Sequence, residues 1–400
     1  MIEKYYNGVI EQVAGGIGNV EHNSILVRYS NDFSIWDLES VNHYKDQTDI
    51  FFTCHEFSYN KIAEAYEPYL GLIRQMFHKY CSGTLEEFME ECDVYKLQRP
   101  VFESYFEKGF CERTEQILID EVEYEQERMH SSIVTMLQKL SEICPIVIVL
   151  NRFQLASKST MQLTNRLLQT KNKNIGIVLG VNDVQSIPEF AHEEWDAICE
   201  SMDDRNMVYH IGNAGRNMEP DVMDYYSDYE SDDGYRKLNN LVYFLDFDQA
   251  DHHLSKIERR IKFDNFTISE KKHYQLLLLQ IMVSVLQRDI AKALESCEDL
   301  EKLQDQEKEG AFYYNFWMAT SYMYLGKLEE AMIYVQKAKE CGEALGDDFL
   351  VFRAELLKAQ NQMSGWCNIF FCAQDIEISD KLIEKLNAYH YKNHLAHIYI

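Results

Sequence analysis

The chain has 400 residues, and its 66 acidic side chains against 39 basic ones give a formal net charge of −27. This balance excludes duplex DNA and anionic membranes as main partners, because binding to phosphate requires a surplus of Lys and Arg. A hydrophobic content of 46% excludes disorder as the dominant state, and only 5 Pro and 17 Gly favour a largely helical chain. At about 100–200 residues per domain, the length predicts two or three domains.

The start of the chain and its cysteines indicate a compartment. Met1 is followed by Ile-Glu-Lys-Tyr-Tyr, which lacks the basic start and apolar run of a signal peptide. No stretch approaches the roughly 18 apolar residues that a membrane helix requires. The ten cysteines form no C-x-x-C pair and no spacing typical of a disulfide frame or a zinc site. We therefore expect a cytoplasmic protein with free thiols, no bound metal and no membrane contact.

The first half of the chain alternates short apolar runs with longer amphipathic stretches. Runs without polar alternation are typical of strands covered on both faces, and helical crossovers between them imply parallel pairing. The predicted strands span residues 25–29, 50–53, 146–150, 175–179 and 208–211. The predicted helices span 61–80, 85–91, 113–143 and 160–170, the last capped by Ser157 or Ser159. We therefore predict an α/β domain with a parallel sheet over residues 1–211.

The pattern stops after this domain. Residues 212–235 are rich in Asp, Glu and Tyr and show no periodic apolar face, which predicts a solvated acidic linker. A docking peptide for a basic partner is the alternative interpretation of the same segment.

Residues 236–400 read as helical throughout, and the pattern repeats. Three alanines, Ala250, Ala293 and Ala331, begin similar stretches in which apolar residues follow four and seven positions later. A small residue at a fixed place lets two antiparallel helices approach closely. The repeat predicts a solenoid of helix pairs, with a fourth pair at 347–363 and 375–389. The apolar last residues do not form the polar cap that a solenoid needs, so we expect the chain to be cut from a longer protein.

This repeat resembles the tetratricopeptide family. In the clearest unit, residues 312–340, Ala319 and Tyr322 fit the first helix, Gly326 the turn, and Ala331 and Ala338 the second helix. The unit departs from the family pattern at Asn315, where a Trp is usual, and it lacks the closing Pro. The resemblance implies that these repeats bind a protein or peptide.

A second resemblance covers about residues 45–185. The strand predicted at 146–150, followed by Gln154, Leu155 and Ala156, resembles the Walker B strand of STAND-type signalling NTPases, a branch of the AAA-like P-loop fold. Residues 52–56 resemble the family's second strand and the strand at 175–179 its sensor strand, with Asn182 at the sensor position. The resemblance implies a P-loop NTPase-like parallel sheet joined to tetratricopeptide repeats, as in the N-terminal regions of bacterial multidomain signalling regulators.

The catalytic residues of that family do not carry over. The two Walker B acids correspond to Asn151 and Arg152, and Asn has no charge for magnesium while Arg cannot act as a base. No G-x-x-x-x-G-K-[ST] phosphate loop occurs. The nearest string, residues 14–20, places Asn19 where the Lys would stand and is most simply a turn before the strand at 25. A degenerate nucleotide site would consist of Asn19, Asn151, Arg152 and Asn182.

Metal and nucleophile signals are weak. His390, His394 and His397 share one helical face but have no acidic or Cys fourth ligand nearby, so we predict no metal site there. No G-x-S-x-G string of a hydrolase nucleophile occurs.

The sequence therefore predicts a non-catalytic regulatory or scaffolding module of an intracellular signalling protein, with no catalytic residues and no obligatory cofactor. Three alternatives stay open. The first is ATP or ADP bound without turnover, as a structural cofactor. The second is the sensory part of a longer diguanylate cyclase, and the third is that of a transcriptional regulator. A homo-oligomer is also compatible with the sequence.

Overall fold

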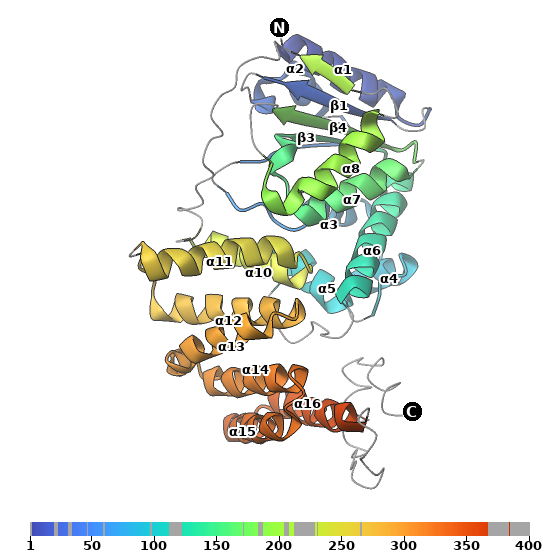
Figure 1. Ribbon diagram of the computed structural model, residues 1–400. Helices are drawn as coiled ribbons and strands as arrows, with labels where there is room; N and C mark the ends of the chain where they lie inside the picture. Colours follow the sequence, from blue (N-terminus) through green and yellow to red (C-terminus); the bar gives the residue numbers. More distant parts are fainter. Residues whose placement is uncertain are drawn as a thin grey trace. The chain divides into compact units, whose positions relative to one another are not determined.

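The computed structural model describes residues 2–384, with gaps at 20–22, 31–33, 46, 59–60, 97, 112–121, 171, 183–186, 204–207, 212–228, 230, 265 and 367–383. The chain divides into two compact units, residues 1–249 and 250–400. The first unit is an α/β sandwich around a parallel sheet and the second is helical (Figure 1). No helix of the described residues is both long and apolar enough to cross a membrane.

The first unit is built on five parallel strands in the order β2-β3-β4-β1-β5. They are β1 (Ser24–Tyr29), β2 (Phe51–Glu56), β3 (Ile146–Asn151), β4 (Ile175–Asn182) and β5 (Val208–Ile211). The five apolar runs thus form strands, as the sequence predicts. β3 and β4 are fully buried because they lie inside the sheet, whereas β2 is an edge strand and half-buried along its length.

The helices of this unit follow the strands as crossovers. Between β1 and β3 lie α2 (Glu39–Lys45), α3 (Tyr69–Tyr80), α4 (Leu85–Glu91), α5 (Arg99–Lys108) and α6 (Val122–Ile143). After β3 come α7 (Lys158–Gln169), then α8 (His192–Asp203) before β5, and α10 (Asp232–Tyr243). Short 3-10 turns precede α2, α7 and α8 at Ile35–Asp37, Phe153–Leu155 and Glu189–Ala191. Ser157 caps α7 by accepting a hydrogen bond from the Thr160 N–H, which confirms one of the two predicted caps.

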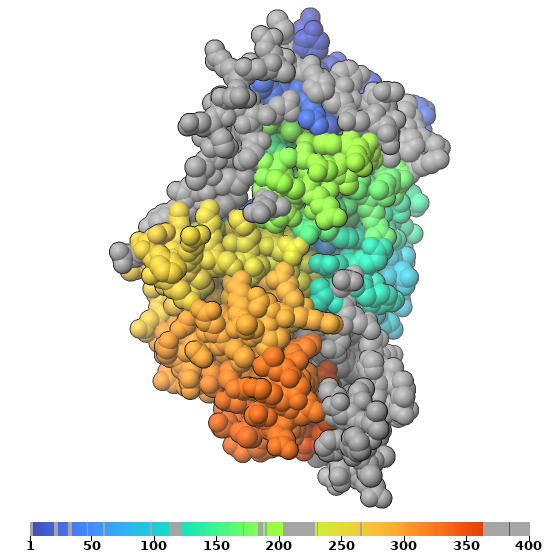
Figure 2. All heavy atoms as spheres, viewed as in Figure 1, coloured from blue at the N-terminus to red at the C-terminus, as the bar shows by residue number. Residues whose placement is uncertain are grey.

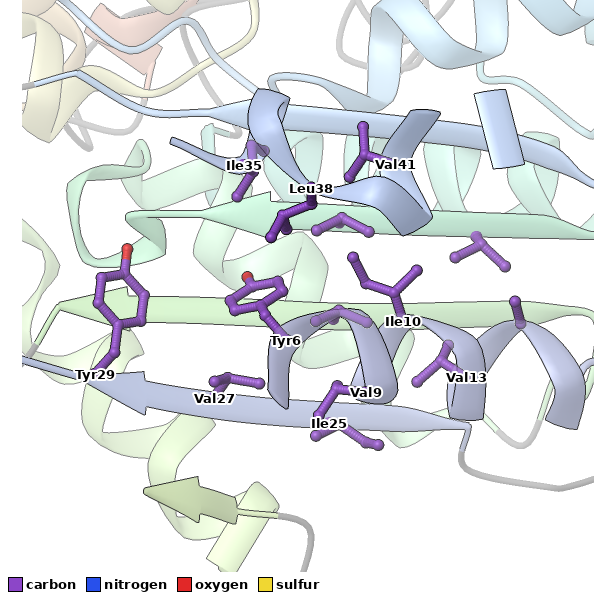
Figure 3. Close-up of a cluster of buried hydrophobic side chains, with 14 residues drawn as sticks. Tyr6, Val9, Ile10, Val13, Ile25, Val27, Tyr29, Ile35, Leu38 and Val41 are labelled. Carbon is purple, nitrogen blue, oxygen red and sulfur yellow. The ribbon is translucent and has the colours of Figure 1, made fainter. Parts of the chain in front are cut away.

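Several helices of the first unit depart from the sequence prediction. The helix expected at 61–80 begins only at Tyr69, because Pro68 has no N–H to donate and disfavours helical backbone in the residue before it. Helices α2, α5 and α8 lie outside the predicted helices, and so does α1 (Ile2–Gly16). Its residues Tyr6, Val9, Ile10 and Val13 share one face and are buried against β1, β3 and β4 (Figure 3). Each such side chain contributes about 1.5–3 kcal/mol when buried.

The first unit extends further along the chain than the predicted limit at residue 211. Helix α10 packs into it through polar contacts: the Asn240 side chain accepts from the Cys111 N–H at 3.0 Å and donates to Glu64 Oε2 at 3.0 Å. Arg236 forms an ion pair with Glu64 at 2.7 Å. The break between the units therefore falls after Gln249. Residues 212–228 of the predicted linker lie outside the described residues.

The second unit consists of paired helices. Helix α11 (Phe247–Phe263) crosses the boundary, and α12 (Glu270–Leu286), α13 (Ile290–Glu301), α14 (Gly310–Tyr324), α15 (Leu328–Leu345) and α16 (Asp348–Trp366) follow, with a 3-10 turn at Gln304–Gln306. α12 packs on α13, and α15 packs on both α14 and α16. The predicted small positions Ala293, Ala319, Ala331 and Ala338 are completely buried, so the helices meet at these alanines. The partner helix predicted at 375–389 lies almost wholly outside the described residues.

Candidate functional site

The structure brings together three of the four predicted site residues. Asn151 ends β3, Arg152 follows it, and Asn182 ends β4, so all three lie at the carboxyl edge of the sheet. Ligands of open parallel sheets bind at this edge. Asn19 lies elsewhere: it is exposed in the turn that precedes β1, next to Gly18, whose N–H donates to the carbonyl of Lys173 ahead of β4. Because all strands are parallel, that turn belongs to the amino edge, and Asn19 cannot join the other three.

The position of Asn19 follows from the direction of the chain. A phosphate loop leads out of the carboxyl end of a strand and into a helix. Gly15 and Gly16 instead end α1, and Gly18 turns the chain into β1 with a φ of 81°. Residues 14–19 of the string are therefore a helix end and a turn, and the turn agrees with the simpler interpretation of the string. The segment that does leave the carboxyl end of β1, residues 30–38, contains neither Gly nor Lys.

Asn151 is the centre of a buried hydrogen-bond network at the carboxyl edge. Tyr29 Oη, at the end of β1, donates to Asn151 Oδ1 at 2.7 Å. Asn151 Nδ2 donates to Glu56 Oε1 at 3.1 Å, and Glu56 ends the neighbouring strand β2. Arg152 Nε lies 3.7 Å from the same Glu56 oxygen. Asn151 is completely buried and Tyr29 is 1% exposed. The oxygen and the nitrogen of the Asn151 side chain are therefore both hydrogen-bonded to protein partners.

The space around this network is filled by side chains from two further elements. Gly180 of β4 faces Tyr6 and Asn151 so closely that an added Cβ would lie 2.6 Å from Asn151 Oδ1 and closer still to Tyr6 Oη. Figure 3 shows the rings of Tyr6 and Tyr29 over the sheet. In the 3-10 turn after β3, Gln154 Oε1 accepts a hydrogen bond from the Asn182 N–H at 3.3 Å, and both residues are buried. The backbone of Asn182 is thus hydrogen-bonded to the turn that follows β3.

This arrangement does not suit magnesium-assisted phosphate chemistry. A magnesium ion is held by carboxylates, waters and phosphate oxygens. The network offers one carboxylate, Glu56, and that group is engaged by Asn151 and by Arg152. The amide of Asn151 is neutral at every accessible pH, so the edge gains no charge from it. The carboxyl edge is therefore a closed structural network, and none of its predicted residues lines the cavity beside β2 described next.

A cavity of about 610 Å³ lies beside the edge strand β2. Its walls carry a cluster of acidic and basic side chains that the sequence did not predict. Glu67 Oε1 lies 3.6 Å from His55 Nε2, and Glu64 holds Arg236 with distances of 2.7 and 3.3 Å. Arg236 also contacts Asp233 at 2.8 Å. These partners come from segments up to 172 residues apart, so no local pattern could have signalled them.

The titration behaviour of these groups decides their chemistry. Burial lowers the pKa of His55 to about 4, so its imidazole is neutral at pH 7. Burial raises the pKa of both Glu64 and Glu67, which Arg236 only partly offsets at Glu64. Burial also raises the pKa of the Cys54 thiol to about 11, so this cysteine is not a thiolate nucleophile at neutral pH. The cavity therefore holds ion pairs and neutral groups without an activated nucleophile among the described residues.

Comparisons with protein families, with curated proteins and with solved structures return no match to this chain. The functional argument therefore rests on the geometry of the two units themselves.

Proposed function

We propose that the chain is a non-catalytic regulatory module. Its α/β unit resembles the core of a STAND-type NTPase but works without nucleotide turnover, and its helical unit binds a protein or peptide in the manner of tetratricopeptide repeats. By the same resemblance, the module belongs to an intracellular signalling protein.

The closed carboxyl edge carries this proposal. Tyr29, Asn151 and Glu56 satisfy one another where an NTPase would hold magnesium and phosphate. Opening the edge for a nucleotide would break both hydrogen bonds to a fully buried amide, and each unsatisfied group would cost about 1–3 kcal/mol. The segment after β1 offers no glycine backbone and no lysine to repay that cost.

The helical unit supports the second part of the proposal. Alanines buried at the contacts let α14 and α15 pack closely, with Gly326 in the turn between them at a φ of 72°. Such helix pairs stack into extended surfaces that repeat proteins use for binding. The strong negative charge favours basic partners, because attraction to the opposite charge speeds their association.

A thermal unfolding experiment with nucleotides tests the first part. A ligand present at 1,000 times its Kd stabilises the folded state by about 4 kcal/mol. Millimolar ATP or ADP with magnesium should therefore raise the melting temperature by several degrees if a micromolar site existed. We expect no change beyond that caused by sodium triphosphate at equal ionic strength. A nucleotide-specific increase, or hydrolysis above the buffer rate, would refute the proposal.

A further inference from the structure

The turn between α10 and α11 has two counterparts further along the chain. Leu245, Arg288 and Gly326 each stand two residues after a helix end and five residues before a buried alanine. All three have a positive φ, of 65°, 63° and 72°. In each turn the same pair of backbone hydrogen bonds closes the preceding helix, as in a Schellman motif. The turn after α10 is therefore the first member of this series, although it belongs to the first unit.

In the first two turns the next residue is an aspartate that can cap the following helix. Asp289 does so, because its side chain accepts a hydrogen bond from the Lys292 N–H of α13 at 3.2 Å. Asp246 stands at the same place in the first turn, but its Oδ2 accepts from the Ser159 N–H at 2.8 Å. Its Oδ1 has no hydrogen-bond partner among the described residues. Asp246 thus serves the first turn of α7 instead of its own helix α11.

The backbone around Asp246 is held in unfavourable conformations. Leu245 takes the left-handed position that glycine usually occupies, as Gly326 does in the third turn, and its side chain is buried. Tyr66 also has a positive φ, of 56°, and its N–H donates to Ser159 Oγ at 3.3 Å. Strain of this kind persists only where surrounding contacts enforce it, and it is concentrated at switch regions. The arrangement of the turn therefore depends on the contacts made around Asp246.

Side chains at the start of α11 make further contacts within the first unit. Gln249 Nε2 donates to the Ala63 carbonyl at 3.0 Å, and Asp248 forms an ion pair with Lys158 of α7. The side chain of Asp248 is 48% exposed, so this ion pair contributes little. Figure 2 shows the yellow surface of α10 beside the green surface of the α/β helices. A hydrogen bond to a buried charge is stronger than a neutral one, so the turn is held mainly by Asp246.

We propose that the turn between α10 and α11 is a latch with two states. In the docked state, which the structure shows, Asp246 accepts from Ser159 and holds the start of α11 on α7. In the released state, Asp246 accepts from the Gln249 N–H three residues on, and so caps α11 as Asp289 caps α13. Because one charged hydrogen bond replaces another, the two states stay close in free energy, as a switch requires. Every contact that the latch makes or breaks lies in the first unit, so the proposal stands whatever the helical unit binds.

Hydrogen exchange of the full chain, read by mass spectrometry with fragmentation to single amides, tests the latch in the wild type. The amides of Ser159 and Tyr66 report the docked state, and those of β3 and β4 report global unfolding. Local opening exposes little surface, so the two latch amides should exchange faster than β3 and β4 and with little dependence on urea below the unfolding transition. Exchange of the latch amides only at the rate and urea dependence of β3 and β4 would overturn the proposal.

Matched substitutions separate the two caps. Asp246→Ala removes both, so exchange at Ser159 should rise at least tenfold while β3 and β4 keep their protection. Asp289→Ala removes a cap of the same geometry outside the latch and should change exchange at Ser159 less than twofold. Asp246→Ser keeps a hydroxyl that can cap α11 but is too short to reach α7. It should free Ser159 as Asp246→Ala does, yet the Gln249 amide should exchange about fivefold more slowly than in Asp246→Ala.

Three results with these variants would each overturn the proposal. Unchanged exchange at Ser159 in Asp246→Ala would show that this contact does not hold the turn. Equal exchange at Gln249 in Asp246→Ser and Asp246→Ala would show that Asp246 has no second helix to cap. Loss of protection in β3 and β4 of Asp246→Ala would show that the contact stabilises the whole unit and is no latch.

Discussion

Replacing Asn151 by Asp places an acid where the Walker B pattern has one, and we predict that it destabilises the protein instead of activating it. The wild-type amide donates to Glu56 Oε1 at 3.1 Å, and an ionised carboxylate cannot donate. The new charge would be completely buried and would face Glu56 directly. At an effective dielectric constant of about 20, two charges about 3 Å apart repel by roughly 5 kcal/mol.

Protonation limits this cost. The new carboxyl escapes the repulsion by taking up a proton, after which its O–H can donate to Glu56 as the amide did. The free energy of protonating a group with an unfolded pKa of about 3.9 is about 4 kcal/mol at pH 7 and about 1.5 kcal/mol at pH 5. Since burial and repulsion raise the folded pKa, the variant loses stability relative to wild type as pH rises above about 4.

Urea unfolding followed by circular dichroism measures this difference. Asn151→Asp should lose about 4 kcal/mol of unfolding free energy at pH 7 and about 1.5 kcal/mol at pH 5, the two protonation costs derived above. Asn42→Asp, at an exposed position on α2, is the control and should stay within about 0.5 kcal/mol of wild type. Wild-type stability of Asn151→Asp at pH 7, or the appearance of ATP hydrolysis, would refute the view that this edge is built around a neutral amide.

Three further predictions concern single contacts. Tyr29→Phe removes the donor to Asn151 Oδ1 and should cost about 1–3 kcal/mol in urea unfolding, whereas Tyr5→Phe at an exposed ring should cost nothing measurable. Burial raises the pKa of Asp246 from 3.8 to about 6, so the wild type should lose about 2.4 kcal/mol of stability as pH rises from 4 to 7, and Asp246→Asn should not show this loss. Parallel pH profiles of the two proteins would contradict this. Ala331→Leu should overpack the contact of α14 with α15 and lower the free energy of unfolding by about 1–3 kcal/mol. Ala344→Leu, at an exposed position of α15, is the control, and equal stability of the two variants would show that the helices do not meet at Ala331.

The strands could be predicted because burial on both faces leaves a direct mark on sequence. The run at 146–150 has no polar residue, and all five of its side chains are completely buried. The alanines of the second unit were predictable for a related reason, since close helix contacts exclude larger side chains. The repeat spacing therefore locates helix contacts, but it does not by itself assign the family or the ligand.

Two errors had signals in the sequence. Tyr6, Val9, Ile10 and Val13 stand at the spacing of one helical face, so α1 was accessible to the same reasoning that predicted α3, α4, α6 and α7. Asn19 was included because a glycine-rich string resembles a phosphate loop. That string precedes the first strand, whereas a phosphate loop follows one, and chain direction alone excludes it.

Other features depend on contacts that no local pattern encodes. Arg236 forms an ion pair with Glu64, which lies 172 residues earlier in the chain, and this pair links α10 to the rest of the first unit. Glu56 and Tyr29 join Asn151 only because strand order places the ends of β1, β2 and β3 at one edge. The sequence places Asn151 and Arg152 after the strand at 146–150, while the fold was needed to identify Tyr29 and Glu56 as the partners of Asn151.

Equilibrium dialysis of the full chain against labelled ATP and ADP, with and without magnesium, tests the central claim most directly. The closed network at Asn151 predicts no saturable binding up to millimolar nucleotide. Saturable binding in the micromolar range that is lost in Arg152→Ala, and retained in a variant of the remote Asn19, would contradict it and would place a working nucleotide site at the carboxyl edge of the sheet.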